Sequence, residues 1–539
     1  MTLRIDRRTF VLTGTLGIGA LMIPGLARAA FQGDHGFTHG VASGEPGQDS
    51  MLFWTRYVPF GGPPVKVRLE VSETPDFARI VAGGEAVTGA WRDFTVKITA
   101  TGLKSGTRYF YRFVSPDSGF SPVGRTKTLP QGRAPSFRIG VFSCSNIAFG
   151  WFNAYAHAAR RTDLDLAVHL GDYIYEYAPN IYPDQAHSIA ARLPAPMAEC
   201  IQLADYRLRY ASYRSDPDLQ ALHAAMPMVI QWDDHEFAND VWEGGAQNHQ
   251  PNEGDWNARR MAAIQAYREW QPVSEEPWKA YEVGTLATLF RTDCRSVRTR
   301  PNELEPFFKT PNPEKALAEF RDGAWRDPAA TVLGSTQEAW LASAMKASVR
   351  AGQRWQVVGF GTIMGDGKSP DGALGWLSPD AAPYARQRVV AGSTVAKVGL
   401  PYNLDGWGGY PAARARFLKS AQAADANLVV ISGDSHNGWA FDLAQDGKPA
   451  GVEFAGQAVS SAGFEDTFSA DPKIIAAALV ARNPELKWCD TSRRGYMALT
   501  LTPEKVSNDW VFMDTVASSN PNGSVGHTAT VARGRNVMG

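Results

Sequence analysis

Four short apolar segments, each followed at once by small and polar residues, constrain this chain more than any other feature of its sequence. Their composition is typical of buried strands, and stretches with helical patterning lie between them. The segments cover residues 137–142, 164–170, 228–232 and 428–431. Strands that alternate with helices predict an α/β domain built of layered sheet and helices. One long stretch, residues 365–410, is rich in Gly, Pro and Asp and is predicted to be irregular loop.

The part of the chain before these segments has a different pattern of apolar and polar residues. From residue 31 to about 129, apolar and polar residues alternate in segments such as 65–71 and 94–98, with Gly, Pro and Asp clusters between them. This pattern predicts a small all-β sandwich of the fibronectin or immunoglobulin type. A chain of 539 residues is also too long for one ordinary core. We therefore predict an N-terminal β-sandwich domain over residues 30–130 and a larger domain over residues 136–520.

The first residues have the features of an export signal. Paired arginines lie within Asp6–Leu12, an apolar and Gly-rich stretch covers residues 11–26, and Ala27-Arg28-Ala29 is a small-x-small cleavage site. A membrane anchor is the alternative, but this stretch is short and rich in Gly. We predict that residues 1–29 are a twin-arginine signal peptide and that the chain passes through the twin-arginine export machinery to the periplasm or the outside. No other stretch is long and apolar enough to span a bilayer.

The charge balance restricts the partners of the chain. Lys and Arg number 54 and Asp and Glu 55, which gives a net charge of -1. Such a balance provides neither a basic surface for specific nucleic-acid binding nor a basic run for a membrane surface. The working expectation is a monomer, although the sequence leaves the oligomeric state open. Four cysteines are too few for a disulfide scaffold, and whether any of Cys200, Cys294 and Cys489 pair is also left open.

The polar residues that follow the four apolar segments are of types that bind metals. The four turns are Ser143-Cys144-Ser145-Asn146, Gly171-Asp172-Tyr173-Ile174-Tyr175-Glu176, Asp233-Asp234-His235-Glu236 and Gly433-Asp434-Ser435-His436-Asn437. In open α/β sheets, ligands bind just beyond the carboxyl ends of the strands. We therefore expect these four turns to converge.

Two metal ions close together suit the hydrolysis of a phosphoester, because its oxygens carry negative charge that resists attack. The ions neutralise this charge, lower the pKa of a bound water and hold the ester in line. Asp172 is our candidate for the carboxylate that bridges both ions. Cys144, Tyr175 and His436 would bind one of them, and thiolate and phenolate ligands favour a ferric or other transition-metal ion.

Hard oxygen ligands would bind the other ion. Asp234 and Asp434 supply carboxylates, which favour Ca²⁺, Mg²⁺ or Mn²⁺. Each residue alone has a simpler interpretation: an Asp after Gly is usually a turn residue, and a lone Cys is usually an inert buried thiol. Asp233 has the pattern of a structural carboxylate, and Glu236 that of a partner of His235 or of a charge at a helix N-terminus. Four such turns in one chain favour the metal site.

These turns resemble the GDxxY, GNHE and GHxH turns of calcineurin-like metallophosphoesterases and purple acid phosphatases. The form with Cys in the first turn, and with Asp replacing Asn and His in the later turns, resembles PhoD-like alkaline phosphatases and phosphodiesterases. Residues 39–46 resemble the N-terminal domain of the same family, and the resemblance extends from about Thr38 to about Val516. It implies an α/β fold in which a four-layer, β-sandwich-centred metallophosphoesterase domain follows a small all-β domain.

The resemblance also implies an activity and a metal centre. The chain is expected to be an exported alkaline phosphatase with phosphodiesterase activity, whose substrates are phosphomonoesters or phosphodiesters. The implied Fe(III) ligands are Cys144, Asp172, Tyr175 and His436. The implied Ca²⁺ ligands are Asp172, Asp234 and Asp434, with Mg²⁺ or Mn²⁺ as alternatives at this second site. The implied catalytic residues are Asp172 and His235, the latter as the histidine that contacts the phosphate or its leaving group.

One turn departs from the family pattern, and two other functions fit the same residues. Gly359-Phe360-Gly361-Thr362 stands where the family often has a turn that contains Gln, so a side-chain contact from that turn is not expected. A phospholipase D-like phosphodiesterase that acts on lipids or teichoic acid-type polymers would use the same site. A secreted binding protein with a structural metal is the third alternative, and its closed site would lack an exchangeable metal-bound water.

Overall fold

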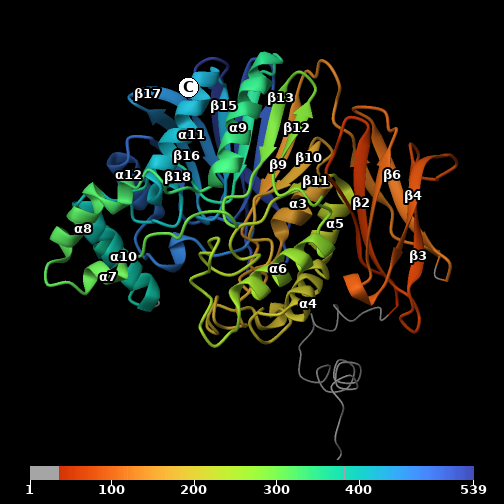
Figure 1. The fold of residues 1–539 in the computed structure, drawn as a ribbon, viewed down its shortest axis with the longest axis horizontal. Coiled ribbons are helices and arrows are strands. Elements are labelled where there is room, and N and C mark those ends of the chain that lie inside the picture. The colour runs from red at the N-terminus through yellow and green to blue at the C-terminus, as the bar shows by residue number, and fades with distance from the viewer. Residues whose placement is uncertain (1–34, 118, 382) are drawn as a thin grey trace, which may run out of the picture.

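The computed structural model describes residues 35–117, 119–381 and 383–539 (Figure 1). The predicted signal peptide, residues 1–29, lies outside the described residues. Among those that are described, no helix is both long enough and apolar enough to cross a membrane.

Two large sheets form the centre of the molecule. The first has nine strands, in the order β21 (Gly523–Ala532), β20 (Lys505–Met513), β19 (Gly495–Leu501), β9 (Phe137–Phe142), β10 (Leu166–His169), β11 (Met228–Ile230), β1 (Gly36–Gly44), β2 (Ser50–Val58) and β5 (Thr95–Thr101). The second has seven, in the order β12 (Lys279–Val283), β13 (Ala287–Arg291), β14 (Trp355–Phe360), β15 (Leu428–Ser432), β17 (Lys448–Ala455), β16 (Gly438–Gln445) and β18 (Leu486–Asp490).

The strands that precede the four turns are the parallel, central strands of these sheets. Strands β9, β10 and β11 run parallel, with Ala167 paired to Gly140 on one side and to Met228 on the other. Strand β15 lies parallel to β14 and β17. All residues of β10 and β15 are buried, because a sheet packed on both faces leaves no polar side. This is why the four segments are mostly apolar in the sequence.

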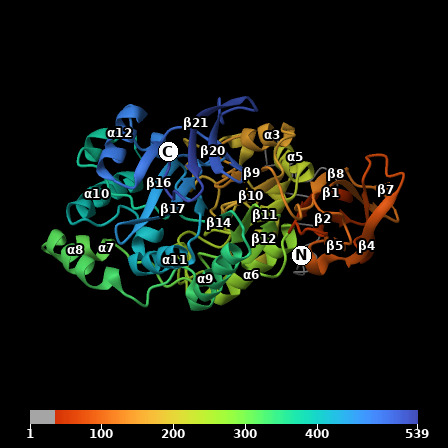
Figure 2. The ribbon, with the colours of Figure 1, turned by 90° about the horizontal axis from the view of Figure 1, so that it is seen from above.

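One core lies between the two sheets and one on the outer side of each. Ile139, Val168, Val357 and Ile431 belong to the core that the sheets share. Four helices cover the outer face of the nine-stranded sheet: α3 (Asn153–Arg160), α4 (Leu203–Arg214), α5 (Pro217–Ala225) and α6 (Trp256–Trp270). Three cover the seven-stranded sheet: α9 (Gly334–Arg350), α11 (Pro411–Ala424) and α12 (Pro472–Arg482). Figures 1 and 2 show the helices on both sides of the central strands.

Three further helices form a lobe at one end of the molecule (Figure 1). They are α7 (Glu305–Phe308), α8 (Pro313–Asp322) and α10 (Pro383–Lys397). The prediction of irregular loop over residues 365–410 is wrong where α10 forms. Val395 of α10 packs with Leu317 and Phe320 of α8 in a small core, and this contact between distant segments stabilises a helix that the Gly- and Pro-rich composition obscured.

The N-terminal region is rich in sheet, as predicted, but its strands are shared with the rest of the molecule. A third sheet contains β4 (Ile80–Thr88), β3 (Val65–Ser72), β6 (Arg108–Ser115), β7 (Gly119–Phe120) and β8 (Gly124–Lys127). It packs on β1, β2 and β5 around Phe53, Val71 and Tyr111. Strand β1 in turn pairs with β11 at Gly44 and Met228. A Cβ atom at Gly44 would lie 2.2 Å from the carbonyl oxygen of Pro272, so this junction requires glycine.

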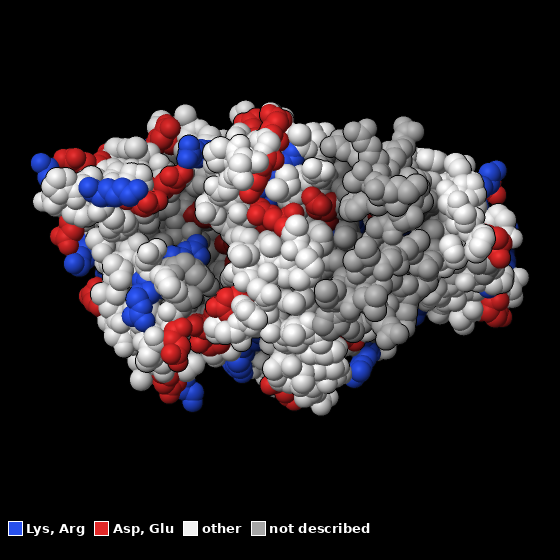
Figure 3. Space-filling model, turned by 90° about the horizontal axis from the view of Figure 1, so that it is seen from below, with Lys and Arg blue, Asp and Glu red and all other residues white. Residues whose placement is uncertain are grey.

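Charges of both signs are interspersed on the face of the molecule that Figure 3 presents. Acidic side chains gather around a hollow, and a few Lys and Arg lie within and beside it. Among the described atoms visible there, no continuous basic area covers this face. The picture agrees with the net charge of -1 and with a substrate that is gathered locally.

Candidate metal centre

The four turns meet at the carboxyl ends of strands from both sheets. Cys144 follows β9, Asp172 follows β10, Asp234 follows β11, and Asp434 and His436 follow β15. The structure brings their side chains into overlapping groups whose ligand atoms lie within 4.8 Å of one another. We call the first group, with the tyrosine beside it, the sulfur side, and it comprises Cys144, Asp172, Tyr175 and His436. We call the second the carboxylate side, and it comprises Asp233, Asp234 and Asp434.

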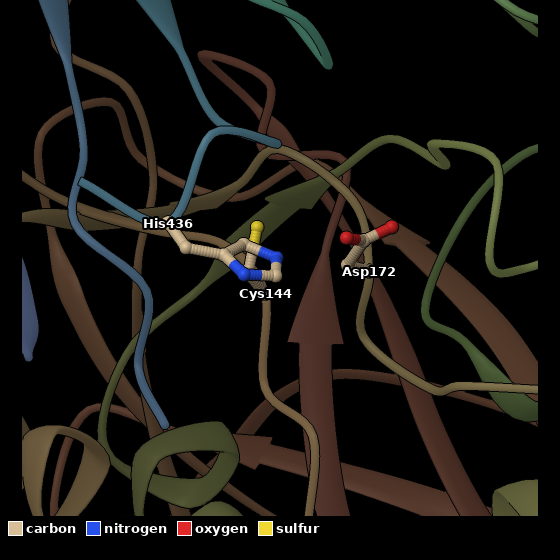
Figure 4. Close-up of side chains that lie close together, drawn as sticks. All are labelled: Cys144, Asp172 and His436. Atoms are coloured by element: carbon tan, nitrogen blue, oxygen red, sulfur yellow. The ribbon is translucent and has the colours of Figure 1, made fainter. Parts of the chain in front are cut away.

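On the sulfur side, Cys144, Asp172 and Tyr175 lie around the imidazole of His436. Figure 4 shows Cys144, Asp172 and His436 side by side at the ends of their strands. The Tyr175 hydroxyl donates to Asp172 Oδ2 at 3.1 Å and lies 3.3 Å from His436 Nε2. His436 Nδ1 lies 2.7 Å from the carbonyl oxygen of Ala462, so this nitrogen carries the proton and Nε2 keeps its lone pair. Burial lowers the pKa of His436 to about 3, which keeps the ring neutral and able to bind a metal.

Four of these residues have a left-handed backbone. The φ angles are 58° at Cys144, 54° at Asp172, 63° at Asp434 and 61° at His436. This conformation is uncommon for residues other than glycine, and such strain gathers at functional sites. Here it accompanies the abrupt exit of the chain from each strand.

Several acidic groups of the centre are buried, and two of their oxygens have no hydrogen-bond partner among the described residues. Burial, and then the charges of neighbouring acids, raise the pKa of Asp172 well above its usual range. Burial and the charge of Asp172 likewise raise the pKa of the Cys144 thiol. Asp172 Oδ1 and Asp234 Oδ1 are buried, yet neither has a hydrogen-bond partner among the described residues. Buried polar atoms are normally paired, so oxygens that converge without partners fit a bound cation.

The carboxylate side contains an arginine that the sequence analysis did not identify. Arg295 is fully buried and donates from Nε and Nη2 to the two oxygens of Asp233 at 2.6 and 2.7 Å. Its Nη2 also lies 3.4 Å from Asp434 Oδ1 and 3.6 Å from Asp234 Oδ1. Although burial opposes ionisation, the charge of Arg295 holds the pKa of Asp234 below its usual value. The same strand-end rule, applied to β13, would have identified Arg295.

Arg295 also contacts a carboxylate from the loop after α10. Arg295 Nη1 pairs with Asp405, and Arg298 Nη2 pairs with the other oxygen of Asp405 at 2.5 Å. Asp405 and Asp240 also form a group of potential ligands with Asp234. No local pattern marks Asp405, because it reaches the centre from a loop 110 residues beyond Arg295.

Two acidic residues, Asp233 and Glu236, stabilise the turns through structural contacts. Asp233 forms the bidentate pair with Arg295, so it has the structural contact that its simpler interpretation predicts. Glu236 accepts the backbone N–H groups of Asp172 at 3.0 Å, Tyr173 at 2.6 Å and Asp233 at 2.7 Å. It thereby joins the second turn to the third, and among the described residues it forms no hydrogen bond with His235.

The partner of His235 is Glu176 of the second turn, a contact that the sequence did not predict. His235 Nδ1 lies 2.7 Å from Glu176 Oε2. Glu176 is fully buried and also accepts from the Asn239 backbone at 2.7 Å and from Asn248 Nδ2 at 2.8 Å. Burial lowers the pKa of His235, but the charges of Asp234, Glu176 and Asp172 together raise it well above its usual value. The ring centroid of Tyr175 lies 4.2 Å from that of His235.

The turn that departs from the family pattern has a steric reason in this chain. A Cβ atom at Gly361 would lie 1.9 Å from Asp233 Oδ1. Its backbone N–H instead lies 3.3 Å from Cys294 Sγ. The space of a side chain at this turn is therefore taken by the Asp233–Arg295 pair.

The remaining cysteines and the strand histidine are not members of the ligand groups, although Cys294 Sγ lies 3.8 Å from Asp233 Oδ1. All four cysteines are buried and free in the described part of the chain. His169 is buried in β10, where its Nε2 lies 2.8 Å from the Tyr155 hydroxyl.

Comparisons with known proteins agree with this geometry. The family model described as PhoD-like phosphatase matches residues 139–510, and the model of the PhoD-like phosphatase N-terminal domain matches residues 25–130. Alkaline phosphatase D of Bacillus subtilis (strain 168) is 33% identical over 505 residues, which cover 89% of this chain and 78% of the relative. A solved structure titled "Structure of PhoD" superposes with a TM-score of 0.75 at 30% identity, over 93% of this chain and 91% of that one. The chain therefore belongs to the PhoD-like phosphatase family and is a phosphoric ester hydrolase.

Proposed function

We propose that this chain is a metal-dependent alkaline phosphatase with phosphodiesterase activity. The observation that carries the proposal is the convergence of buried ligand groups whose donor atoms lie within 4.8 Å, with Asp172 Oδ1 and Asp234 Oδ1 unpartnered. The sulfur side would hold Fe(III). Asp172, Asp234 and Asp434 would hold Ca²⁺, with Mg²⁺ or Mn²⁺ as alternatives.

The donor set of each side fits the ion assigned to it. A thiol, a phenol and a neutral imidazole accompany one carboxylate on the sulfur side, and such ligands favour a transition metal. On the carboxylate side all donors are oxygens, which hard divalent cations prefer. Asp172 belongs to groups on both sides of the centre, because its oxygens lie near Cys144 and His436 and also near Asp234. When bound, the ions would neutralise the phosphoryl oxygens and lower the pKa of a water molecule.

His235 would supply the proton for the leaving oxygen. Glu176 accepts the Nδ1–H group, so the proton that can be donated is at Nε2. Asn239 and Asn248 hold Glu176, and this fixes the orientation of the imidazole before the ester binds. The carboxylates around His235 favour its protonated form, which a general acid requires.

The placement of the chain in the cell and its division into domains complete the proposal. We propose export by the twin-arginine route to the periplasm or beyond, with residues 1–29 as the signal. Residues 30–130 would form a fibronectin-like sandwich and residues 136–520 a four-layer catalytic domain, in a monomer. Supporting this division, the N-terminal family model ends at residue 130 and the catalytic model begins at residue 139.

The test combines metal analysis with two substrates. The purified chain is assayed with p-nitrophenyl phosphate and with bis(p-nitrophenyl) phosphate, with and without a calcium chelator, and its iron and calcium are measured. We expect bound iron, turnover that the chelator abolishes and Ca²⁺ restores, and hydrolysis of both esters. A preference for diesters would favour the phospholipase D-like alternative. A metal-free chain that stays inactive after reconstitution with iron and calcium would contradict the proposed centre.

A further inference from the structure

A buried arginine without a counter-charge lies between the N-terminal strands and the helices of the larger part of the molecule. Arg214, the last residue of α4, is fully buried, and its guanidinium carbon lies 4.0 Å from the ring centroid of Trp54 on β2. Its Nε, Nη1 and Nη2 atoms have no hydrogen-bond partner in the described part of the chain. No carboxylate of the described residues forms an ion pair with it.

Two other buried arginines of the same layer pair with carboxylates, and Arg209 of α4, which has no ion pair, donates to five backbone carbonyls; Arg214 has neither kind of partner. Arg192 lies over the Trp151 ring at 4.6 Å and pairs with Asp216 at 2.9 Å. Arg259 pairs with Glu199 at 2.7 Å. A buried guanidinium stays protonated, and its desolvation exceeds what one aromatic ring returns.

The unpartnered atoms around Arg214 come from both sides of the interface. His39 Nε2 on β1, His223 Nδ1 on α5 and the amide of Gln271 after α6 are all buried without hydrogen-bond partners. Burial lowers the pKa of both histidines, the charge of Arg56 lowers that of His39 further, and the charge of Arg214 adds to the effect at both, so Arg214 lies within electrostatic range of each ring. Arg214 and Gln271 also lie near the Tyr173 hydroxyl without reaching hydrogen-bond geometry.

The hydrogen bonds of the two histidines make their free nitrogens donors. The Tyr173 hydroxyl lies 2.8 Å from His223 Nε2, and when it donates there the neutral ring carries its proton on Nδ1. Thr38 Oγ1 accepts from Arg56 Nη1 at 3.1 Å and lies 2.8 Å from His39 Nδ1. When its hydroxyl donates to Nδ1, the neutral ring of His39 carries its proton on Nε2.

No neighbouring group of the described chain supplies the missing negative charge. The two histidines are neutral because burial, together with Arg214, lowers their pKa. Burial raises the pKa of the Tyr111 phenol, which is also near Arg214, and so keeps it protonated. The carboxylates closest along these elements are engaged elsewhere, Asp216 with Arg192 and Asp93 with Arg56. One positive charge thus remains without a counter-charge, and the N–H groups around it lie near the Tyr173 hydroxyl and the Ala211 carbonyl without reaching hydrogen-bond geometry.

We propose that Arg214, together with Gln271, His39 and His223, binds a small monovalent anion such as chloride at this interface. A monatomic anion accepts several N–H groups from different directions and neutralises one guanidinium charge. It needs no further cation, which a phosphate or other multivalent anion would. The anion joins β1 and β2 to α4, α5 and α6, so its binding stabilises the contact between the N-terminal strands and the helices.

Thermal unfolding at constant ionic strength tests the proposal. Chloride or bromide replaces gluconate, an anion too large for a site built of buried side chains. Ligand binding to the folded state alone should raise Tm by about 1 °C for each tenfold increase in halide above the dissociation constant. Arg214→Met should abolish this dependence. Arg192→Met, the matched control, removes a buried guanidinium that also lies over a Trp ring but has a carboxylate partner, and it should keep the dependence.

Diffraction from the unsubstituted chain tests for the anion directly, even if Arg214→Met does not fold. Crystals soaked in bromide should give an anomalous peak within hydrogen-bond distance of the Arg214 guanidinium. Water alone at this position, with a Tm that does not respond to halide, would overturn the proposal. The metal centre is not involved in either measurement, so the result is independent of the proposed catalytic function.

Discussion

The two sides of the metal centre differ in how the protein compensates their charge. On the sulfur side, burial and mutual repulsion raise the pKa of Cys144 and Asp172, and no arginine or lysine contacts either group among the described residues. On the carboxylate side, Arg295 pairs with Asp233 and Asp405 and lies within 3.6 Å of Asp234. One side therefore depends on an added cation for its charge balance, and the other is balanced in part by the protein itself.

This difference has a consequence for metal affinity. A cation on the sulfur side gains the full interaction with groups that have no other partner, so its binding should be tight. A cation on the carboxylate side lies near the positive charge of Arg295, which reduces the net attraction of the acids. We therefore expect the second ion to exchange more readily, in keeping with a chelator-sensitive site.

The largest expected effect is at the residue that both sides share. Asp172→Asn removes the charge of the bridging carboxylate and should lower kcat by at least about 10³-fold, with loss of metal from both sides. Steady-state assays and metal analysis of the purified variant check this. Asp163→Asn, on the surface beside Arg138 and Arg161, is the control and should behave as the parent. Near-normal turnover in Asp172→Asn would refute the bridging assignment.

Removing Arg295 should leave the carboxylate side, like the sulfur side, without an arginine to balance its negative charges. Arg295→Met leaves Asp233 without its partner and should lower the free energy of unfolding of the metal-free chain by about 3 kcal/mol. Added Ca²⁺ should restore part of this loss, because the ion replaces the missing charge. Arg298→Met is the matched control, since Asp405 keeps Arg295 and the loss should be smaller. Equal losses in the two variants, measured by thermal or denaturant unfolding, would contradict the distinction.

A substitution on the sulfur side should act on one metal only. Cys144→Ser replaces the soft donor and should weaken iron binding by at least about 100-fold, while calcium is retained. Iron and calcium content, together with the visible absorption of the purified protein, report this directly. Cys489→Ser, which alters a buried thiol on β18 outside the ligand groups, should keep its iron. Unchanged iron in Cys144→Ser would exclude the thiol as a ligand.

The smallest effect is expected at Glu176, which acts through His235. Glu176→Gln removes a charge that raises the pKa of His235, so this pKa should fall. The proton donor is then lost at a lower pH, and the alkaline limb of the kcat profile should move toward lower pH, with a decrease in kcat of about 10-fold. Glu253→Gln alters another His–Glu pair, the partly buried one with His249, and should leave the profile in place. A profile that does not move in Glu176→Gln would assign Glu176 a purely structural role.

Local sequence patterns located the strands and the turns of this centre. The runs at β9, β10, β11 and β15 are mostly apolar because both faces of these strands are largely buried, and a run of this kind is visible in the sequence. The polar residues after each run could be named for the same reason. The resemblance to PhoD-like phosphatases added the family, which the comparisons bear out.

The partners of those residues could not be found in this way. Glu176 lies 59 positions before His235, and Asp405 lies 110 positions after Arg295. The helix α10 was missed because its stability depends on contacts with α8. Each of these features is a contact between distant segments, and a local pattern contains no information about the distance between them.

The sequence by itself determined where the chain leaves its buried strands and which side chains it presents there, because burial and turn formation depend on neighbouring residues. The tertiary structure alone decided how the charges of those side chains are balanced. It placed Arg295 among the carboxylates and left Cys144 and Asp172 without a protein cation. It also enclosed Arg214 between two regions with no acid beside it. Electrostatic compensation acts through space, so it is set by the packing of segments that are far apart in the chain.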